Sequence, residues 1–115
     1  MIEQPEVVDV PTRGRYEARL AGALVGYTAY RTMPGRLVVV DTVVLEPKRL
    51  DTDGPSYPGH RTAVGDALSA AVLADVRRHR TNLSPLCPVL VDYLRRHPQH
   101  HDLIDPSYRG AFAEA

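Results

Sequence analysis

The hydrophobic pattern changes halfway along the 115-residue chain, and this change limits the fold more than any other feature. Up to about residue 45, apolar residues occur in short runs or alternate with polar ones, which is typical of β-strands. From residue 61 they recur every three or four positions, which is the spacing of an amphipathic helix. Strands followed by a long helix, and then by a short strand and a helix, predict a fold of the α/β (α+β) class.

Four strands are predicted in the first half, over residues 7–10, 15–20, 24–30 and 36–45. The turn between the last two is predicted at Met33-Pro34-Gly35, because proline and glycine favour tight turns. The fourth range is almost continuous in valine and leucine, which indicates a central strand buried on both faces. Asp41 and Thr42 interrupt this run, and polar side chains in a buried strand need hydrogen-bond partners.

Two helices and one strand are predicted in the second half. The helix over residues 61–80 carries one apolar stripe, formed by Val64, Leu68, Ala71, Val72 and Val76. Residues 82–85 are predicted to be a short strand, and residues 89–97 a second helix that follows Pro88 and is ended by Pro98. A right-handed crossover sets the short strand beside residues 36–45 and parallel to them. We therefore expect a mixed, mostly antiparallel sheet of about five strands with two helices.

The length and composition fit a single domain over residues 1–115, in which residues 1–4 and 106–115 are loosely held tails. Residues 46–59 contain three prolines and two glycines, which predict a loop. A loop of this length inside a domain often carries function.

Charge and composition exclude several classes of partner. Fourteen basic and fourteen acidic residues give a formal net charge of zero, so no overall field attracts nucleic acid or an anionic membrane. The single cysteine, Cys87, fits a reducing compartment. No secretory signal is recognised, and no apolar run approaches the roughly 18 residues that span a bilayer. We expect a cytoplasmic monomer or weak dimer that binds neither nucleic acid nor membrane.

The start of the long helix is a candidate anion site. A helix N-terminus presents unpaired N–H groups and the positive end of the helix dipole, and both suit a phosphate. His60 and Arg61 add positive charge, Thr62 adds a hydroxyl donor, and the small residues Ala63 and Gly65 allow close approach. The alternative is that Thr62 is the N-cap of an ordinary helix.

Cys87 precedes Pro88 at the start of the second predicted helix. A thiol in this position ionises more readily, because the positive end of the helix dipole favours the thiolate. Cys87 is therefore a candidate nucleophile or proton donor, and the alternative is an inert buried cysteine.

Three histidines near Asp102 suggest a metal site, but Pro98 separates His97 from His100 and His101 and removes a shared helix face. We expect these side chains to be solvated, and we predict no metal.

These pieces resemble the small acetyltransferase-like proteins of the YjdJ type, within the GCN5-related N-acetyltransferase (GNAT) superfamily. The C-terminal signature of that family is matched by Cys87-Pro88, Tyr93, Arg95-Arg96-His97-Pro98 and Asp102-Leu103. Its paired early strands are matched by Arg15-Tyr16-Glu17, Gly22, Gly26-Tyr27 and Tyr30. Asp41-Thr42-Val43-Val44 stands where the family usually has His-Thr-x-Val, and Ala63 stands where its pyrophosphate loop has the first glycine.

The resemblance implies a GNAT-like sheet and a protein that binds acetyl-CoA. The residues implied in cofactor binding are Val43, Val44, His60, Arg61, Thr62, Ala63, Val64, Gly65 and Asp66. The pantetheine arm is expected between the strand that ends at Val43-Val44 and the strand before Cys87, where the two strands splay apart.

The implied activity is transfer of an acetyl group from the CoA thioester to an amine. Asp41 or Glu46 is expected to accept a proton from the amine. Cys87 is expected near the thioester sulfur, where it either protonates the departing thiolate or briefly takes the acetyl group. The acceptor amine, on a protein or on a small molecule, stays open. The alternative is a catalytically silent CoA-binding or partner-binding domain of the same fold.

Overall fold

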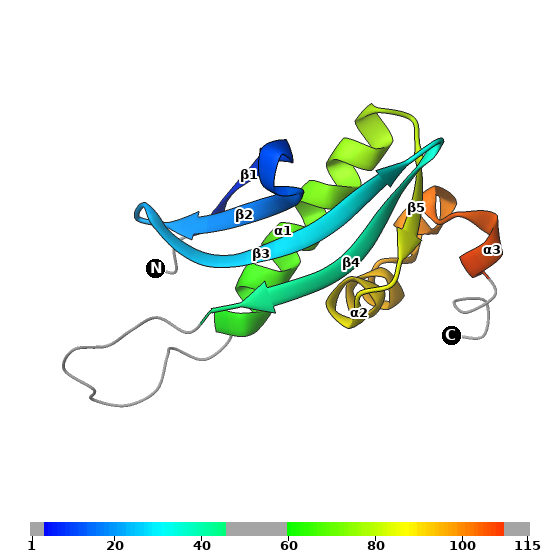
Figure 1. The fold of residues 1–115 in the computed structure, drawn as a ribbon. Helices are drawn as coiled ribbons and strands as arrows, with labels where there is room; N and C mark the ends of the chain where they lie inside the picture. The colour runs from blue at the N-terminus through cyan, green and yellow to red at the C-terminus, as the bar shows by residue number, and fades with distance from the viewer. Residues whose placement is uncertain (1–3, 46–59, 110–115) are drawn as a thin grey trace.

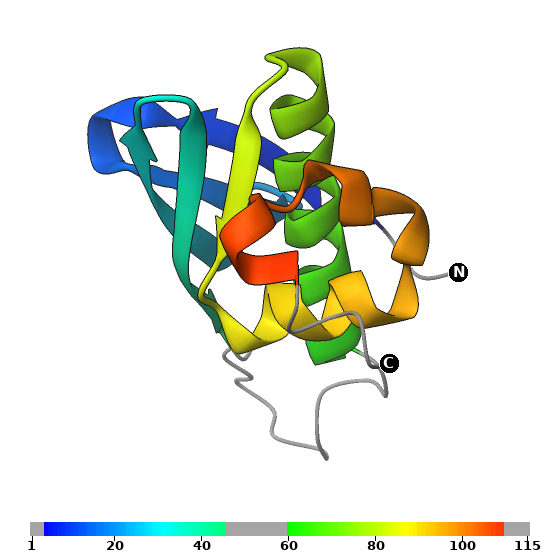
Figure 2. The ribbon, with the colours of Figure 1, turned by 90° about the vertical axis from the view of Figure 1, so that its right-hand side faces the viewer.

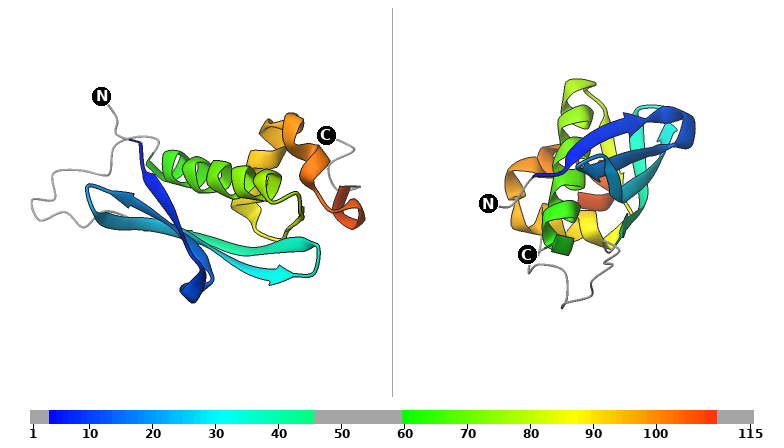
Figure 3. Two further views of the ribbon diagram at one scale, coloured as in Figure 1. Left: turned by 90° about the horizontal axis from the view of Figure 1, so that it is seen from above. Right: turned by 90° about the vertical axis from the view of Figure 1, so that its left-hand side faces the viewer.

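The computed structural model describes residues 4–45 and 60–109 and consists of one sheet with helices on one of its faces (Figure 1). The strands are β1 (Glu6–Val10), β2 (Arg15–Leu20), β3 (Ala23–Met33), β4 (Arg36–Val44) and β5 (Asn82–Pro85). The α-helices are α1 (His60–Arg78), α2 (Pro88–Arg96) and α3 (Pro106–Arg109), with short 3-10 turns η1 (Pro11–Arg13) and η2 (Pro98–Leu103). Seen from above, strands and helices form two layers (Figure 3).

The strands lie in the sheet in chain order, from β1 to β5. The first four pair in antiparallel fashion and β5 pairs parallel to β4, which confirms the predicted mixed sheet. The β3–β4 hairpin closes between Met33 and Arg36 through Pro34-Gly35. Gly35 has a φ of 75°, a left-handed conformation that glycine adopts at little cost.

A β-bulge shapes the middle of β4. Tyr30 pairs with Val39 and Ala29 pairs with Asp41, so Val40 is the extra residue. Val40 is 41% exposed, and only Val39 is fully buried within β4, all of which is described. The prediction of a strand buried on both faces is therefore wrong. The helices cover one face of the sheet, and within residues 4–45 and 60–109 no element lies over the other face of β4 (Figure 2).

The core lies between the sheet and α1. The predicted stripe of α1 is confirmed at its centre, because Val64, Leu68, Val72 and Val76 are almost completely buried. Each such side chain contributes roughly 1.5–3 kcal/mol through removal from water. Further buried side chains come from β5, α2 and the segment after η2: Leu83, Leu90, Leu94, Leu103 and Ile104.

The C-terminal segment packs on the core more closely than predicted. Ile104 is fully buried and bridges to Leu83 of β5, and the Asp105 N–H donates to the Leu83 carbonyl at 2.7 Å. The expectation of a loose tail from residue 106 is corrected at Pro106–Arg109, which forms α3 and packs Tyr108 against the core. Among the described residues, no helix combines the length and apolar content needed to cross a bilayer.

Candidate functional site

β4 and β5 part before β4 ends. Their pairing stops at Val39 and Pro85, and the last link is the Leu86 N–H, which donates to the Val39 carbonyl at 3.0 Å. The chain then turns into α2, while β4 continues to Val44 (Figure 1). The described part of the chain places no strand beside residues 40–44 on that side. This is the splay that the family resemblance implies, and the exposed side chains of Val40 and Leu86 come from the two segments that separate here.

Backbone groups of β4 face the gap between the parted strands. The Leu45 N–H donates to the Val25 carbonyl of β3 at 2.9 Å. Because backbone groups alternate along a strand, residues 42 and 44 direct theirs away from β3 and into the gap. The Thr42 N–H donates to Oδ1 of Asp41 at 2.9 Å. The carboxylate predicted as a proton acceptor therefore lies at the gap and covers one of its N–H groups.

Cys87 lies at the same place but in the core. It is the N-cap residue of α2, with Pro88 in the first turn, as predicted. Its side chain is completely buried, and Sγ donates to Oγ1 of Thr42 at 3.1 Å. Oγ1 of Thr42 also hydrogen-bonds with Oγ1 of Thr28, at 2.9 Å. This row of three polar groups joins α2 to the middle of the sheet, and the thiol reaches a ligand only if these elements move.

A pocket of about 490 Å³ lies where α1 begins. It is bounded by the end of β4, the first two turns of α1 and the exposed side of α2. The lining residues are Val44, Arg61, Thr62, Gly65, Asp66, Pro88, Val89, Asp92 and Arg96. The structure thus gathers five of the predicted cofactor-binding residues around one hollow, next to the gap between β4 and β5.

The other predicted residues lie around this pocket or outside the description. Val64 is completely buried and belongs to the core. Ala63 is partly buried in α1 and has no positive φ, so its backbone does not require glycine. Val43 pairs with Tyr27 of β3. The backbone of His60 begins α1, but its side chain and all of Glu46 lie outside the described residues.

Two carboxylates and two guanidinium groups line the pocket. Arg96 contacts Asp66 with Nη2 at 2.9 Å and Nη1 at 3.3 Å, and its Nε contacts Asp92 at 3.1 Å. The hydrogen bond to Asp66 raises the pKa of Arg96, so the guanidinium is permanently charged. Asp66 is therefore engaged with Arg96. Arg61 and Thr62 line the pocket at the N-terminus of α1, where the positive end of the helix dipole attracts an anion.

Two glycines set the spacing of the elements around the pocket. A Cβ on Gly26 would lie 2.8 Å from both the Val43 carbonyl oxygen and Cγ1 of Val64. A Cβ on Gly65 would lie 3.1 Å from Cγ1 of Val89. Gly26 thus lets α1 approach the sheet closely, and Gly65 lets it approach α2. Besides any role toward a phosphate, Gly65 leaves room for the Val89 side chain.

Sequence reasoning missed Asp92 and Arg96 as pocket residues. Their spacing of four positions on α2 is a signal for an ion pair on a helix surface. The contact between Asp66 and Arg96 joins residues thirty positions apart, and no local pattern indicates it. In the comparisons with known proteins, neither the protein-family models nor the curated proteins gave a match. The function proposed next therefore depends on the geometry of the gap and the pocket.

Proposed function

We propose that this protein is an acetyl-CoA-dependent N-acetyltransferase of the GNAT type, which moves the acetyl group from the CoA thioester to an amine. The observation that carries the proposal is the early parting of β4 and β5 next to the pocket at the start of α1. A strand edge with backbone groups facing outward suits the two amides of a pantetheine arm. The N-terminus of α1, with Arg61 and Thr62, suits the phosphates.

The gap also supplies groups for acyl transfer. Acetyl-CoA, when bound, provides the acetyl group as an activated thioester. The backbone N–H group of Val44 faces the gap and can donate to the oxygen that becomes negative during transfer, and that of Thr42 can do so once it releases the Asp41 carboxylate. The amine forms the new C–N bond as the C–S bond breaks, and its proton passes to the Asp41 carboxylate or, through water, to solvent. The departing thiolate then takes up a proton.

Cys87 is the predicted source of that last proton. Its thiol donates to Thr42 and is completely buried, so it has to exchange this partner before it protonates a thiolate. Direct transfer therefore ranks above an acetyl-cysteine intermediate. If Cys87→Ser turns over as fast as the wild type, Cys87 only packs and holds Thr42.

A second candidate function is a CoA-binding or partner-binding domain without transferase activity. The observation that favours it is the Asp41 carboxylate over the Thr42 N–H, because an anion at this point opposes the negative charge of the transition state. In that function acetyl-CoA binds, but no amine is acetylated.

Thermal unfolding with acetyl-CoA, followed by a thiol-release assay with a panel of amines, separates these functions. Ligand at about 100 times its dissociation constant adds about 2.7 kcal/mol to the free energy of unfolding. We expect a clear rise in Tm and amine-dependent release of CoA. Binding without release favours the silent domain, and neither effect at millimolar acetyl-CoA refutes both functions.

Thr62→Glu places a carboxylate at the proposed phosphate position on an exposed side chain and should abolish the shift in Tm. Ala70→Glu adds the same charge on an exposed position of α1 outside the pocket and is the matched control. Gly65→Glu should also abolish binding, but it disturbs the contact with Val89 as well. Unchanged affinity in Thr62→Glu would show that the phosphates bind elsewhere.

A further inference from the structure

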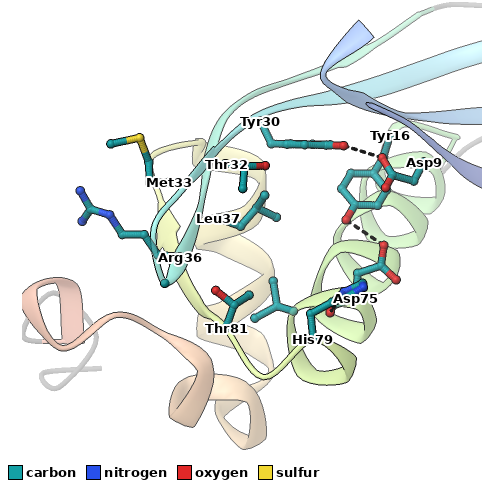
Figure 4. Close-up of a pocket in the computed structure, with 12 residues that line it drawn as sticks. Asp9, Tyr16, Tyr30, Thr32, Met33, Arg36, Leu37, Asp75, His79 and Thr81 are labelled. Atoms are coloured by element: carbon teal, nitrogen blue, oxygen red, sulfur yellow. Dashed lines mark hydrogen bonds between the residues drawn. The ribbon is translucent and has the colours of Figure 1, made fainter. Parts of the chain in front are cut away.

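A second pocket, of about 330 Å³, lies at the opposite end of α1 beneath the β3–β4 hairpin (Figure 4). Its aromatic walls are Tyr16 and Tyr30, and Leu37 and Val76 supply apolar surface. Asp75 and the other lining residues of α1 lie more than two turns beyond Asp66. At 1.5 Å per residue this is roughly 15 Å along the helix. The pocket is therefore separate from the proposed acyl-donor groove, by which we mean the gap between β4 and β5 together with the pocket at the start of α1.

Two phenol–carboxylate hydrogen bonds fix the polar side of the pocket. The Tyr30 hydroxyl donates to Oδ1 of Asp9 at 2.6 Å, and the Tyr16 hydroxyl donates to Oδ2 of Asp75 at 2.9 Å (Figure 4). The two rings lie 5.1 Å apart between their centroids, tilted by 51°. Burial, together with the bond to Asp9, raises the pKa of Tyr30 to about 12, and burial raises the pKa of Tyr16 as well. Both phenols therefore remain donors near neutral pH.

The two carboxylates differ in their charge balance. Asp75 forms an ion pair with Arg78. Within residues 4–45 and 60–109, no arginine or histidine forms an ion pair with Asp9. Arg36 also lines the pocket, but its guanidinium points outward (Figure 4) and Nη1 lies 3.4 Å from Oγ of Ser84. Among the described residues that line the pocket, Asp9 is thus a carboxylate without an ion-pair partner.

His79 also lines the pocket, at its rim. Its Nδ1 lies 2.9 Å from the Asp75 carbonyl oxygen, and an acceptor at that position makes Nδ1 the protonated nitrogen. In the tautomer that carries its proton on Nδ1, Nε2 is an acceptor. A ligand that donates hydrogen bonds fits this rim better than one that accepts them.

We propose that this pocket binds a small organic ammonium ion, with its charge at Asp9 and its apolar body against the rings of Tyr16 and Tyr30. The Asp9 carboxylate attracts the ammonium group through a charge-assisted hydrogen bond, and the two rings offer apolar surface to the organic body. The volume lies at the low end of the range for small-molecule sites, which favours a compact ligand over a peptide. The binding does not depend on the proposed acetyltransferase activity.

The proposal is tested by NMR titration of the full chain with benzylammonium at pH 7, with benzyl alcohol as the uncharged ligand of the same shape. We expect benzylammonium to shift the amide signals of residues 30–37 and 75–81, and benzyl alcohol to bind about tenfold more weakly. Equal affinities, no binding of benzylammonium, or shifts confined to the start of α1 would overturn the proposal.

Asp9→Asn keeps an acceptor for the Tyr30 hydroxyl and removes the charge, so benzylammonium should bind about tenfold more weakly. Glu6→Gln makes the same charge change on an exposed residue of β1 that does not line the pocket, and it should leave the affinity unchanged. Equal affinities of the two variants would refute the role of Asp9. Tyr30→Leu tests the aromatic wall independently and should also lose most of the binding.

Discussion

Replacing Gly26 with alanine tests how closely α1 is held against the sheet beside the proposed acyl-donor groove. The new Cβ would lie 2.8 Å from the Val43 carbonyl oxygen and from Cγ1 of Val64, about 0.6 Å short of ordinary contact at 3.4 Å. Extra volume in a packed interior costs about 1–3 kcal/mol. The reduced freedom of the unfolded chain offsets about 0.4–1 kcal/mol of this. We therefore expect a net loss of about 1–2 kcal/mol in the free energy of unfolding.

Urea unfolding followed by circular dichroism measures this loss as a lower midpoint at unchanged slope. In a domain of this size, each kcal/mol of lost stability lowers Tm by roughly 4–8 °C. Adding Val64→Ala removes one of the two contacts but leaves the Val43 carbonyl, so it should not restore stability.

Gly65→Ala is the matched control. Its Cβ would lie 3.1 Å from Cγ1 of Val89, about 0.3 Å short of ordinary contact and half the shortfall at Gly26. Alanine also gains about 1 kcal/mol of helix propensity over glycine inside a helix. We expect this variant to be as stable as the wild type or more stable. A Gly26→Ala protein with wild-type stability would refute the close packing of α1 on the sheet.

Three further predictions concern buried polar groups. Thr42→Val should lower the free energy of unfolding by about 1–3 kcal/mol in urea, because the Cys87 thiol and the Thr28 hydroxyl lose their shared partner. A thiol reagent should modify Cys87 at least about 100-fold more slowly in the folded protein than in urea, because the thiol is completely buried; rapid labelling would instead reveal an open groove. Hydrogen bonds from arginines on β2 lower the pKa of Glu17 in the folded protein. The ionised carboxylate therefore stabilises the fold when the pH lies above the pKa of the unfolded state, near 4.3. This stabilisation is lost as the pH falls through the lower pKa of the folded state. Glu17→Gln should therefore melt below the wild type at pH 7, and a difference in Tm that did not shrink as the pH was lowered would contradict this cause.

The parts of the fold that could be predicted are those that depend on local sequence patterns. The strand at residues 82–85 and the apolar stripe of α1 follow from short-range spacing, and both are confirmed. The openness of β4 was not predictable from its valines, because apolarity does not tell whether a second layer covers the sheet. The packing of α3 also depends on a surface, around Leu83, that distant segments build.

Some features of the candidate site could likewise be predicted from local sequence, and others could not. Thr62 and Gly65 are close in sequence, so their shared position at a helix start was predictable. The sequence also placed Cys87 at a helix start, but it did not show that this start faces the core. The pocket at Tyr16 and Tyr30 draws residues from several strands and one helix and has no sequence motif.

If the proposed acetyl-CoA site is right, the hydrogen bond between Asp41 and the Thr42 N–H makes binding at this strand edge an exchange of acceptors. A thioester carbonyl that accepts a hydrogen bond from this N–H displaces the Asp41 carboxylate. The measured affinity for acetyl-CoA therefore reflects the difference in free energy between the two hydrogen bonds. Removing the Asp41 carboxylate should change the affinity for acetyl-CoA and the rate of turnover in opposite directions. Asp41→Ala should hold acetyl-CoA more tightly and yet acetylate amines more slowly.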